Sequence, residues 1–418
     1  MTTPQPLIDQ FKRRISYLRL SVTDRCDLRC SYCMPERQTF LPRSEVLSLE
    51  ELHQLALGFI ARGVTKIRLT GGEPLVRRDM IELVRALGRQ VGESLEELTL
   101  TTNGTRLALF ADDLAAAGVR RVNVSLDTLD RARFAELARR DSMPQVLEGL
   151  AAAKAAGLKV KINTVALKGV NEVELPDLIG WAHGQGFDLT LIEVMPLGEV
   201  ETDRFDHYLP LDAVRRDLDA RWTLTDNDAR SGGPARYVDI AETGGRLGFI
   251  TPLTSNFCAG CNRVRVTATG QLFMCLGGEG QVDLRAALRS DAPEAALETA
   301  FARAMGEKPE RHHFEINAPG AAPALARHMS MTGGVMVGSH TAKLVFLGRL
   351  ADRAGAAERE VAPGPLEAVL AALDPGLAID LLDERVRLAL NGALLGERGG
   401  IILAAGDELA FLPPVSGG

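Results

Sequence analysis

The chain has 418 residues, of which 46% are hydrophobic and 25% charged, with a formal net charge of −7. This length predicts two or three domains with ample chain for a hydrophobic core. The charge excludes a general attraction to nucleic acid or anionic membranes. No apolar run approaches the roughly 18 residues of a membrane helix, and residues 1–14 lack an apolar signal core. We therefore expect a cytoplasmic protein that binds neither nucleic acid nor membrane.

Short β-rich runs alternate with amphipathic helical patterns from Tyr17 to Met195. A Ser48–Glu51 capping box marks the start of the first helix. Six strand–helix repeats predict parallel strands with right-handed crossovers, so the fold class is α/β, as a barrel or an open sheet. The expected strands are residues 17–22, 66–70, 98–101, 121–126, 160–165 and 189–194, and the expected helices are 48–62, 80–90, 107–117, 145–156 and 174–185.

Polar motifs follow these strands where each one ends. A first cysteine triplet follows strand one, Gly-Gly-Glu-Pro (71–74) strand two and Thr-Asn-Gly (102–104) strand three, while Ser125 and Met195 lie at the ends of strands four and six. Because the carboxyl ends of parallel strands share one rim of the sheet, we expect these motifs to form one site.

A second cysteine cluster follows a stretch, residues 196–257, in which only a helix at 211–220 is readable. Cys258 and Cys261 precede Arg-Val-Arg-Val-Thr (263–267), a Thr-Gly turn and residues 271–276, which together predict a β-hairpin. Folding back at the turn would bring Cys275 opposite Val264 and beside Cys261. Strand alternation then places Arg263, Arg265 and Thr267 on one face.

The character of the chain changes after residue 334. Residues 335–340 are expected to be a linker between a domain at 1–334 (barrel about 15–200, second cysteine region about 200–334) and a small α+β domain at 341–418. The second domain is expected to contain a strand at 342–347, a helix at 365–373 and a hairpin at 385–395 around Asn391. Its last strand leads into a Gly-Gly tail.

All six cysteines of the chain fall into two triplets, Cys26, Cys30, Cys33 and Cys258, Cys261, Cys275. In a reducing compartment, clustered cysteines bind metal more often than they form disulfides. Three thiolates are one too few for a 4Fe–4S cluster, which takes four ligands. The triplets therefore predict two 4Fe–4S clusters, each with one iron open to a substrate. Structural zinc sites and disulfides remain as alternatives.

The first triplet, C-x3-C-x2-C with Tyr32 between its last two cysteines, resembles the radical S-adenosylmethionine superfamily. The resemblance implies a partial (β/α)6 barrel in which S-adenosylmethionine chelates the open iron and yields a 5′-deoxyadenosyl radical. It also implies that the backbone at Gly72 approaches the methionine amine. Tyr32, Ser125 and Met195 occupy positions that resemble S-adenosylmethionine contacts.

The second triplet with its Arg-Val-Arg-Val-Thr run is similar to that of the GTP 3′,8-cyclase family, which begins molybdenum cofactor biosynthesis. The resemblance covers residues 18–334 and implies conversion of GTP to 3′,8-cyclo-7,8-dihydro-GTP, with guanine on the second cluster. Arg263 and Arg265 would also be catalytic, as would Gly333 and Gly334 of a tail that reaches the active site, although this chain continues past it. The implied GTP ligands are Arg19, Lys66, Arg68, Thr101, Lys161, Arg263 and Arg265.

Residues 341–418 resemble the small, sulfur-carrying subunit of molybdopterin synthase, a ubiquitin-like β-grasp domain. The resemblance implies that Gly418 is adenylated and converted to a thiocarboxylate. It further implies several partners: the large subunit of molybdopterin synthase, an adenylating and sulfurating enzyme, a downstream cyclic pyranopterin monophosphate synthase and an electron donor. A homodimer is also possible on this interpretation.

Two other functions remain open from the residues alone. One is a radical S-adenosylmethionine peptide maturase with an auxiliary cluster, although such enzymes commonly carry more cysteines. The other is a carrier or protein modifier with the barrel as scaffold, although a scaffold would have no need of six clustered thiolates.

Overall fold

The computed structural model describes residues 4–34, 40–195, 197, 206–229, 232–254, 257–312, 314, 342–361, 364–383, 385–391, 393–395, 401–403 and 407–413. The chain divides into two compact units, Met1–Met336 and Val337–Gly418, and the division falls inside the expected linker. The linker itself, Gly333, Gly334 and Gly418 lie outside the described residues.

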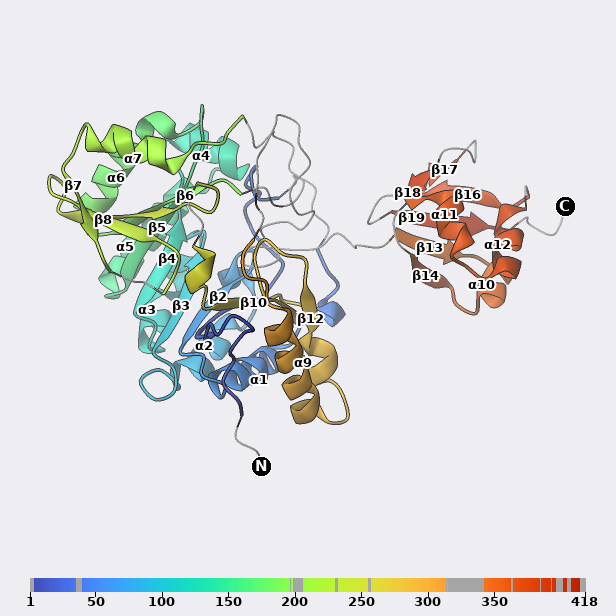
Figure 1. Ribbon diagram of the computed structural model, residues 1–418. Helices are drawn as coiled ribbons and strands as arrows, with labels where there is room; N and C mark the ends of the chain where they lie inside the picture. Colours follow the sequence, from blue (N-terminus) through green and yellow to red (C-terminus); the bar gives the residue numbers. More distant parts are fainter. Residues whose placement is uncertain are drawn as a thin grey trace. The chain divides into compact units, whose positions relative to one another are not determined.

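The described part of the first unit has one sheet of 12 strands in the order β12-β11-β10-β1-β2-β3-β4-β5-β6-β9-β8-β7 (Figure 1). The strands are β1 (Tyr17–Ser21), β2 (Lys66–Thr70), β3 (Glu97–Thr102), β4 (Arg121–Ser125), β5 (Lys159–Ala166), β6 (Asp188–Glu193), β7 (Leu224–Asn227), β8 (Arg236–Ile240), β9 (Gly245–Ile250), β10 (Arg263–Val266), β11 (Gln271–Phe273) and β12 (Gln281–Asp283).

Strands β1 to β6 are parallel and lie side by side in chain order. Strand β10 continues this parallel array beyond β1, and β9 continues it beyond β6. Antiparallel strands extend both ends, with β11 and β12 on one side and β8 and β7 on the other. Parallel strands in chain order are the arrangement of a barrel, whereas a doubly wound sheet reverses its order midway. The fold is therefore α/β with a partial barrel.

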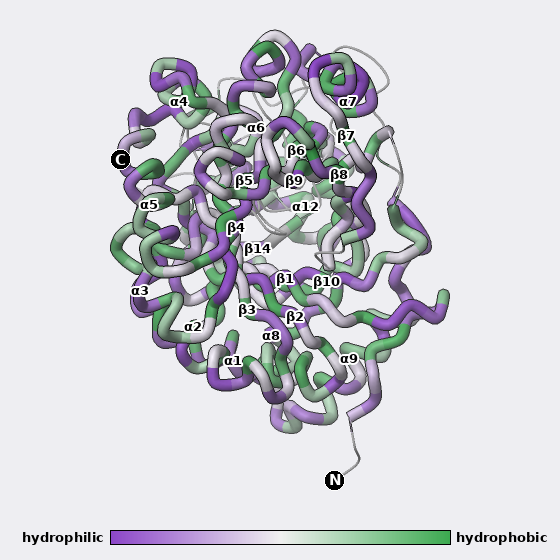
Figure 2. Tube along the Cα trace, turned by 90° about the vertical axis from the view of Figure 1, so that its left-hand side faces the viewer, coloured by the Kyte–Doolittle hydropathy of each residue, from purple (hydrophilic) through white to green (hydrophobic). Residues whose placement is uncertain are grey.

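In the described residues of the first unit, the helices between Leu49 and Gly184 connect the parallel strands β1 to β6 and cover the sheet, and three more helices follow β6 or β12 (Figure 1). Figure 2 shows hydrophobic and hydrophilic stretches alternating along these helices, as expected when one face of each packs against the sheet. They are α1 (Leu49–Ile60), α2 (Met80–Gly88), α3 (Leu107–Ala116), α4 (Arg131–Ala138), α5 (Met143–Ala155), α6 (Leu175–Gly184), α7 (Leu211–Asp219), α8 (Leu284–Leu288) and α9 (Pro293–Glu307), with short 3-10 turns at Arg43–Glu45, Pro74–Val76, Glu172–Glu174 and Cys258–Gly260.

The predicted capping box is confirmed at the start of α1. The Ser48 hydroxyl accepts from the Glu51 amide at 3.1 Å, and the Glu51 carboxylate accepts from the Ser48 amide at 2.7 Å. The six strands and five helices predicted for residues 17–195 are present, and their ends differ from the predicted ones by at most two residues. The sequence did not indicate α4, α8, α9 or β12. It also missed the three strands β7 to β9, so the interpretation of residues 196–257 was incomplete. None of the helices in the described part of the chain has the length and apolar character needed to span a bilayer.

The described part of the second unit has a five-stranded sheet, β14-β13-β19-β16-β17, and a separate β15-β18 pair. Strand β13 runs parallel to β19 at the centre, and Phe346 stacks on Phe411 across them at 5.9 Å. This mixed sheet with helices agrees with the expected β-grasp fold. The elements are β13 (Ala342–Phe346), α10 (Arg349–Ala354), β14 (Glu358–Val361), β15 (Gly364–Pro365), α11 (Leu366–Ala371), α12 (Pro375–Leu382), β16 (Arg387–Leu390), β17 (Ala393–Leu394), β18 (Ile402–Leu403) and β19 (Glu408–Leu412).

Candidate active site

The register of three neighbouring parallel strands gathers arginines into one row. Arg19 of β1 is the Cα partner of Arg68 on β2 and of Arg265 on β10. Two residues earlier on the same face of β1, Tyr17 is the Cα partner of Lys66 on β2 and of Arg263 on β10. Because strand side chains alternate, these two rows point to the same side of the sheet. The sheet therefore concentrates positive charge at β10, β1 and β2.

The arginines of this cluster lie close together and are buried or half-buried. Arg265 is 8% exposed, and burial with Arg19 and Arg263 nearby lowers its pKa well below the usual value. Burial likewise lowers the pKa of Arg19 to about 10, with Arg68 and Arg263 adding to the effect. Like charges placed so close favour an anion among them. The cluster therefore has the charge that a highly charged anion would need.

Two polar atoms in this region lack a hydrogen-bond partner among the described residues although they are buried: the Arg68 Nε and the Thr101 hydroxyl. Both side chains line the large pocket described below. Buried polar groups in proteins are nearly always hydrogen-bonded. The lack of a partner among the described residues fits a site in which a ligand supplies the remaining acceptor.

Lys66 does not share this arrangement. Its ammonium forms an ion pair with Glu97, which also binds Arg121 at 2.6 Å, and it lies 5.2 Å from the centre of the Tyr17 ring. It is absent from the residues that line the pocket among those described. Six of the seven expected GTP ligands therefore line the pocket, and Lys66 does not. Its ammonium is already paired with the Glu97 carboxylate.

Lys161 reaches the pocket from β5, on the far side from β10. Its ammonium donates to the hydroxyl of Tyr237 on β8 at 3.0 Å. Lys161 is 4% exposed, and burial, together with Arg68, Arg121 and Lys66, lowers its pKa to about 7. Tyr237 was not predicted as a site residue, because its strand was not recognised.

One pocket of about 1920 Å³, including its part open to solvent, unites these groups with both cysteine triplets. The predicted site residues that line it are Arg19, Cys26, Cys30, Tyr32, Cys33, Arg68, Gly72, Thr101, Ser125, Lys161, Met195, Cys258, Cys261, Arg263, Arg265 and Cys275. The expected convergence of the strand-end motifs on one site is therefore what the structure has. The roles of the single residues remain predictions.

The Gly-Gly-Glu-Pro segment ties strand β2 to the loop of the first triplet. The Gly72 amide donates to the Thr23 carbonyl at 3.1 Å, and the Glu73 amide donates to the Arg25 carbonyl at 2.9 Å. The Glu73 carboxylate is fully buried and accepts from the Asn103 amide at 2.6 Å. Asn103 in turn donates to Asp27, between Cys26 and Cys30, at 2.7 Å. The motif thus positions the cysteine loop.

Gly71 makes this close approach possible. Its φ of +147° is rare for residues with side chains, and a Cβ there would lie 2.5 Å from the Thr23 carbonyl oxygen. We expect Gly71→Ala to lower the free energy of unfolding by roughly 2–4 kcal/mol, because strain and a backbone clash add. Gly180→Ala, in α6 with open space around it, is the control and should be neutral or stabilising. Thermal unfolding measures both, and equal effects would contradict this role of Gly71.

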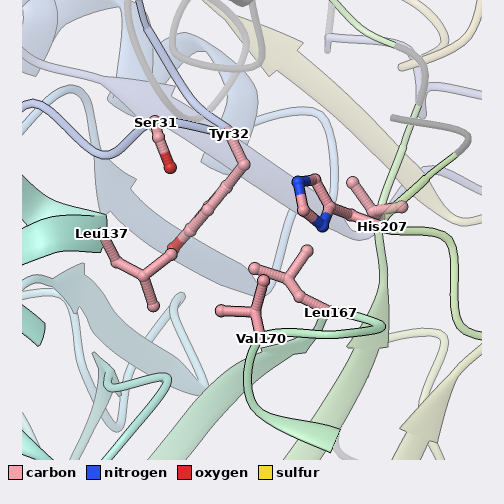
Figure 3. A pocket seen from close by; sticks show the side chains of 7 residues that line it. Ser31, Tyr32, Leu137, Leu167, Val170 and His207 are labelled. Atoms are coloured by element: carbon pink, nitrogen blue, oxygen red, sulfur yellow. The ribbon is translucent and has the colours of Figure 1, made fainter. Parts of the chain in front are cut away.

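Tyr32 lines both the large pocket and a second one of about 300 Å³. Figure 3 shows its side chain among Leu137, Leu167 and Val170, with His207 nearby. The hydroxyl donates to the Asp127 carboxylate at 2.5 Å. Burial raises the pKa of Asp127 to about 6 even though this hydrogen bond opposes it. The hydrogen bond fixes the tyrosine at the edge of the first triplet.

The second triplet lies on the predicted hairpin. Arg265 pairs with Phe273, and Val266 with Leu272, across β10 and β11, so the fold-back that the sequence indicated is confirmed. Cys258 begins a 3-10 turn (Cys258–Gly260) that precedes β10, and Cys261 caps the end of this turn. Thr267 hydrogen-bonds at the turn to Thr269 at 2.8 Å and does not line the pocket among the described residues. Only Arg263 and Arg265 therefore share the pocket face.

The thiol sets fit iron–sulfur clusters by their chemistry. All six cysteines are free thiols, which argues against the disulfide alternative. Burial and the neighbouring Cys33 and Cys26 raise the pKa of Cys30. In the second triplet, burial raises the pKa of Cys258, and the neighbouring Cys275 and Cys261 add to this effect. A hydrogen bond with the His312 backbone opposes it. Within the described residues no group of three or more His, Cys, Asp or Glu is arranged to hold a single metal ion. A cluster differs in that it offers each thiolate a separate iron.

Several residues of this site had no assigned role before the structure. Asp127 and Glu193 were detectable in principle, because each lies two residues from a predicted contact, Ser125 or Met195. Lys308 and His312 gave no signal, since they follow α9, a helix the sequence had not indicated. A lone lysine or histidine after a helix is ordinarily a surface residue.

Three family matches cover most of the chain. Residues 20–182 match the Radical SAM superfamily, residues 187–314 match Molybdenum Cofactor Synthesis C, and residues 344–418 match the ThiS family. The chain is also similar to SuiB from Streptococcus suis bound to S-adenosylmethionine, with 17% identity over 70% of this chain and 65% of that one and a TM-score of 0.48.

Curated relatives cover the first unit at high identity. GTP 3′,8-cyclase from Erythrobacter litoralis (strain HTCC2594) is 73% identical over 78% of this chain and 98% of its own length. GTP 3′,8-cyclase from Rhizobium meliloti (strain 1021) is 58% identical over 80% of this chain and 96% of its own length. The chain therefore belongs to the GTP 3′,8-cyclase family and carries a ThiS-family domain at its carboxyl end.

Proposed function

We propose that this chain converts GTP to 3′,8-cyclo-7,8-dihydro-GTP for molybdenum cofactor biosynthesis, using two 4Fe–4S clusters and S-adenosylmethionine. One observation carries the proposal: the cations Arg19, Arg68, Lys161 and Arg265, of which the last two are buried, line the same pocket as both cysteine triplets. A nucleotide triphosphate needs several cations at one place. A radical reaction on that nucleotide needs the clusters in the same enclosure.

The proposed role of the cations is to bind and orient the triphosphate. Arginine guanidinium groups form forked hydrogen bonds with phosphate oxygens. The Arg68 Nε and the Thr101 hydroxyl would supply donors that have no partner among the described residues. Arg263 lies at the second triplet, two residues after Cys261, where guanine would be held. The residues thus define a direction for GTP, with its base toward the second triplet.

Cys26, Cys30 and Cys33 would hold the first cluster, and Cys258, Cys261 and Cys275 the second. When bound, the first cluster and S-adenosylmethionine supply a 5′-deoxyadenosyl radical. Tyr32, Gly72, Ser125 and Met195 would line the S-adenosylmethionine end of the pocket. The contribution of the chain is to hold the C3′ and C8 regions of GTP in one orientation and to exclude water.

The direct test uses the anaerobically reconstituted full chain with GTP, S-adenosylmethionine and a low-potential reductant. The expected products are 5′-deoxyadenosine and 3′,8-cyclo-7,8-dihydro-GTP, identified by mass spectrometry. 5′-Deoxyadenosine without any product derived from GTP, or with a product derived from a peptide, would contradict the proposal.

GTP affinity should depend on pH through Lys161. Its pKa of about 7 in the unliganded protein means that it is largely neutral at pH 9, and burial with Arg68, Arg121 and Lys66 maintains this state against Asp188. Only the ammonium form attracts phosphate, so binding above pH 7 requires proton uptake. We expect the Kd for GTP to rise by up to about tenfold per pH unit above pH 7. Equilibrium binding to the holoenzyme from pH 6 to 9 measures this.

The matched control is Lys161→Met. In the unfolded chain a lysine titrates near 10.5, so between pH 7 and 10.5 the unfolded state binds the extra proton. The fold therefore gains stability as pH rises through this range. The variant should lose both this rise in stability and the decline in GTP affinity. A parental pH profile in Lys161→Met would contradict the assignment to Lys161.

We further propose that the second unit is a sulfur carrier for molybdopterin synthase, with a thiocarboxylate formed at Gly418. The ThiS-family match over residues 344–418 supports this. Deletion of Gly417 and Gly418 should abolish thiocarboxylate formation, measured by intact mass after incubation with an adenylating enzyme and a sulfur source. Cyclase turnover should stay within about twofold of the parent. Loss of both activities would contradict the division of labour.

The proposed partners follow from these two activities: the large subunit of molybdopterin synthase, the adenylating and sulfurating enzyme, the cyclic pyranopterin monophosphate synthase that takes the cyclised nucleotide, and an electron donor. A homodimer and a contribution of Gly333 and Gly334 to catalysis remain predictions. So does a cytoplasmic location, which the six free thiols favour.

A further inference from the structure

Lys308 is a buried lysine at the second triplet that the proposed reaction does not use. It directly follows α9, and its side chain is among the largest that the structure buries completely, with 1% exposure. Its ammonium donates to the Arg263 carbonyl at 3.0 Å, to the Met274 carbonyl, and to the Cys261 sulfur at 3.8 Å. An ammonium has three N–H donors, so all three are engaged at the hairpin that carries the cysteines.

The charge of Lys308 faces the thiols. Of its three partners, only the Cys261 sulfur can carry a negative charge, since the other two are backbone carbonyls. The carboxylate of Asp9 is paired with Arg13 at 2.6 Å. An isolated buried ammonium is costly unless it has a negative partner. The negative groups best placed for this role are the thiolates of the second triplet.

The two triplets differ in this respect. In the first set the Cys26 sulfur accepts from the neutral amide of Asn103 at 3.7 Å, and the same amide donates to the Asp27 carboxylate at 2.7 Å. In the second set the Cys261 sulfur accepts from the Lys308 ammonium at 3.8 Å. The first triplet thus lies beside a carboxylate and the second beside a cation. Hydrogen bonds to sulfur and net charge are among the factors that set the reduction potential of an iron–sulfur cluster.

We infer that Lys308 is a positioning residue of the second cluster: it acts as a buried counter-cation that binds the Cys261 sulfur and raises the reduction potential of that cluster. This inference rests on the proposed second 4Fe–4S site. A positive charge stabilises the reduced, more negative cluster. Without Lys308, the cluster would be harder to reduce while its three cysteine ligands stay in place.

The test is a redox titration of the second cluster alone, in the full-length chain with Cys26, Cys30 and Cys33 changed to alanine. Into this parent we place Lys308→Met, which removes charge and donors, Lys308→Gln, which keeps an N–H donor without the charge, and Lys308→Arg, which keeps the charge. Lys154→Met is the control, because Lys154 is exposed and also donates to a carbonyl, that of Gln185, at 2.7 Å. Electron paramagnetic resonance measures the reduced cluster at each applied potential, and the iron content of each variant is measured alongside.

At a fixed applied potential, we expect Lys308→Met and Lys308→Gln to have at least a tenfold lower ratio of reduced to oxidised cluster. For one electron this corresponds to a reduction potential that is lower by at least about 59 mV. Lys308→Arg should remain nearer the parent, and Lys154→Met should match it. If Lys308→Met fails to fold, Lys308→Gln against Lys308→Arg decides. Potentials equal to that of the parent in the variants without the charge would overturn the inference while leaving the cluster intact. A parent that binds no iron would overturn the second site and this inference with it.

Discussion

Cys275→Ala is expected to lower the iron content of the reconstituted chain from about eight to about four atoms, since each 4Fe–4S cluster carries four. Cys275 lines the pocket with Cys258, Cys261 and the arginines of β10. Without the second cluster the base of GTP loses its proposed anchor. Because a misplacement of about 1 Å can reduce a rate by about 100-fold, cyclisation should fall by at least that factor. Anaerobic iron analysis and product quantification measure the two effects.

The reciprocal variant separates the two clusters. Cys30→Ala should also lose about four irons, but it should lose 5′-deoxyadenosine formation as well, whereas Cys275→Ala should retain S-adenosylmethionine cleavage. Unchanged cyclisation in Cys275→Ala would refute the second site. Identical defects in both variants would show that the two triplets do not act as separate clusters.

Arg265→Ala should weaken GTP binding strongly and yet leave the fold intact. Arg265 lies between β1 and β11 with Arg19 and Arg263 as charged neighbours. Truncating one member of a buried charged pair costs about 2–5 kcal/mol, so the Kd for GTP should increase at least about 30-fold. The unliganded variant should melt at the parental temperature or above, because a buried like-charge repulsion is removed.

A matched control for Arg265→Ala is Arg236→Ala, an exposed arginine on β8 beside the pocket residue Ala235. It should change neither property by more than a small amount. Calorimetric titration with GTP and thermal unfolding of the same samples measure both properties. A loss of stability equal to the loss of affinity would mean that Arg265 is structural. Parental affinity would remove Arg265 from the site.

The parts of the fold that the sequence predicts well are those with local signals. The strands β1 to β6 are short β-rich runs separated by amphipathic helical patterns, and the Ser48–Glu51 capping box marks the start of the first helix, α1. The turn at Gly270, where φ is +86°, fixed the hairpin and so the position of Cys275. These signals suffice to predict the barrel, the position of Cys275 beside Cys261, and the shared face of Arg263 and Arg265.

Other features depend on contacts between distant segments and had no local signal. Strand alternation correctly places Lys66 and Arg68 on the same face of β2. The ion pair that engages Lys66 depends on Glu97, which lies on the neighbouring strand β3. Strands β7 and β8 carry exposed and charged residues in a sheet extension, so their pattern resembles a loop. Lys308 is a single charged residue after a helix, and only the packing of α9 against the hairpin region places it at Cys261.

The most direct test of the account is anomalous diffraction at the iron edge from anaerobic crystals of the full chain with GTP and S-adenosylmethionine. The account predicts iron at both cysteine triplets, each with one ligand from a small molecule, and the triphosphate against Arg19, Arg68 and Arg265. Zinc at either triplet, a disulfide between any of the cysteines, or GTP bound away from these arginines would contradict it.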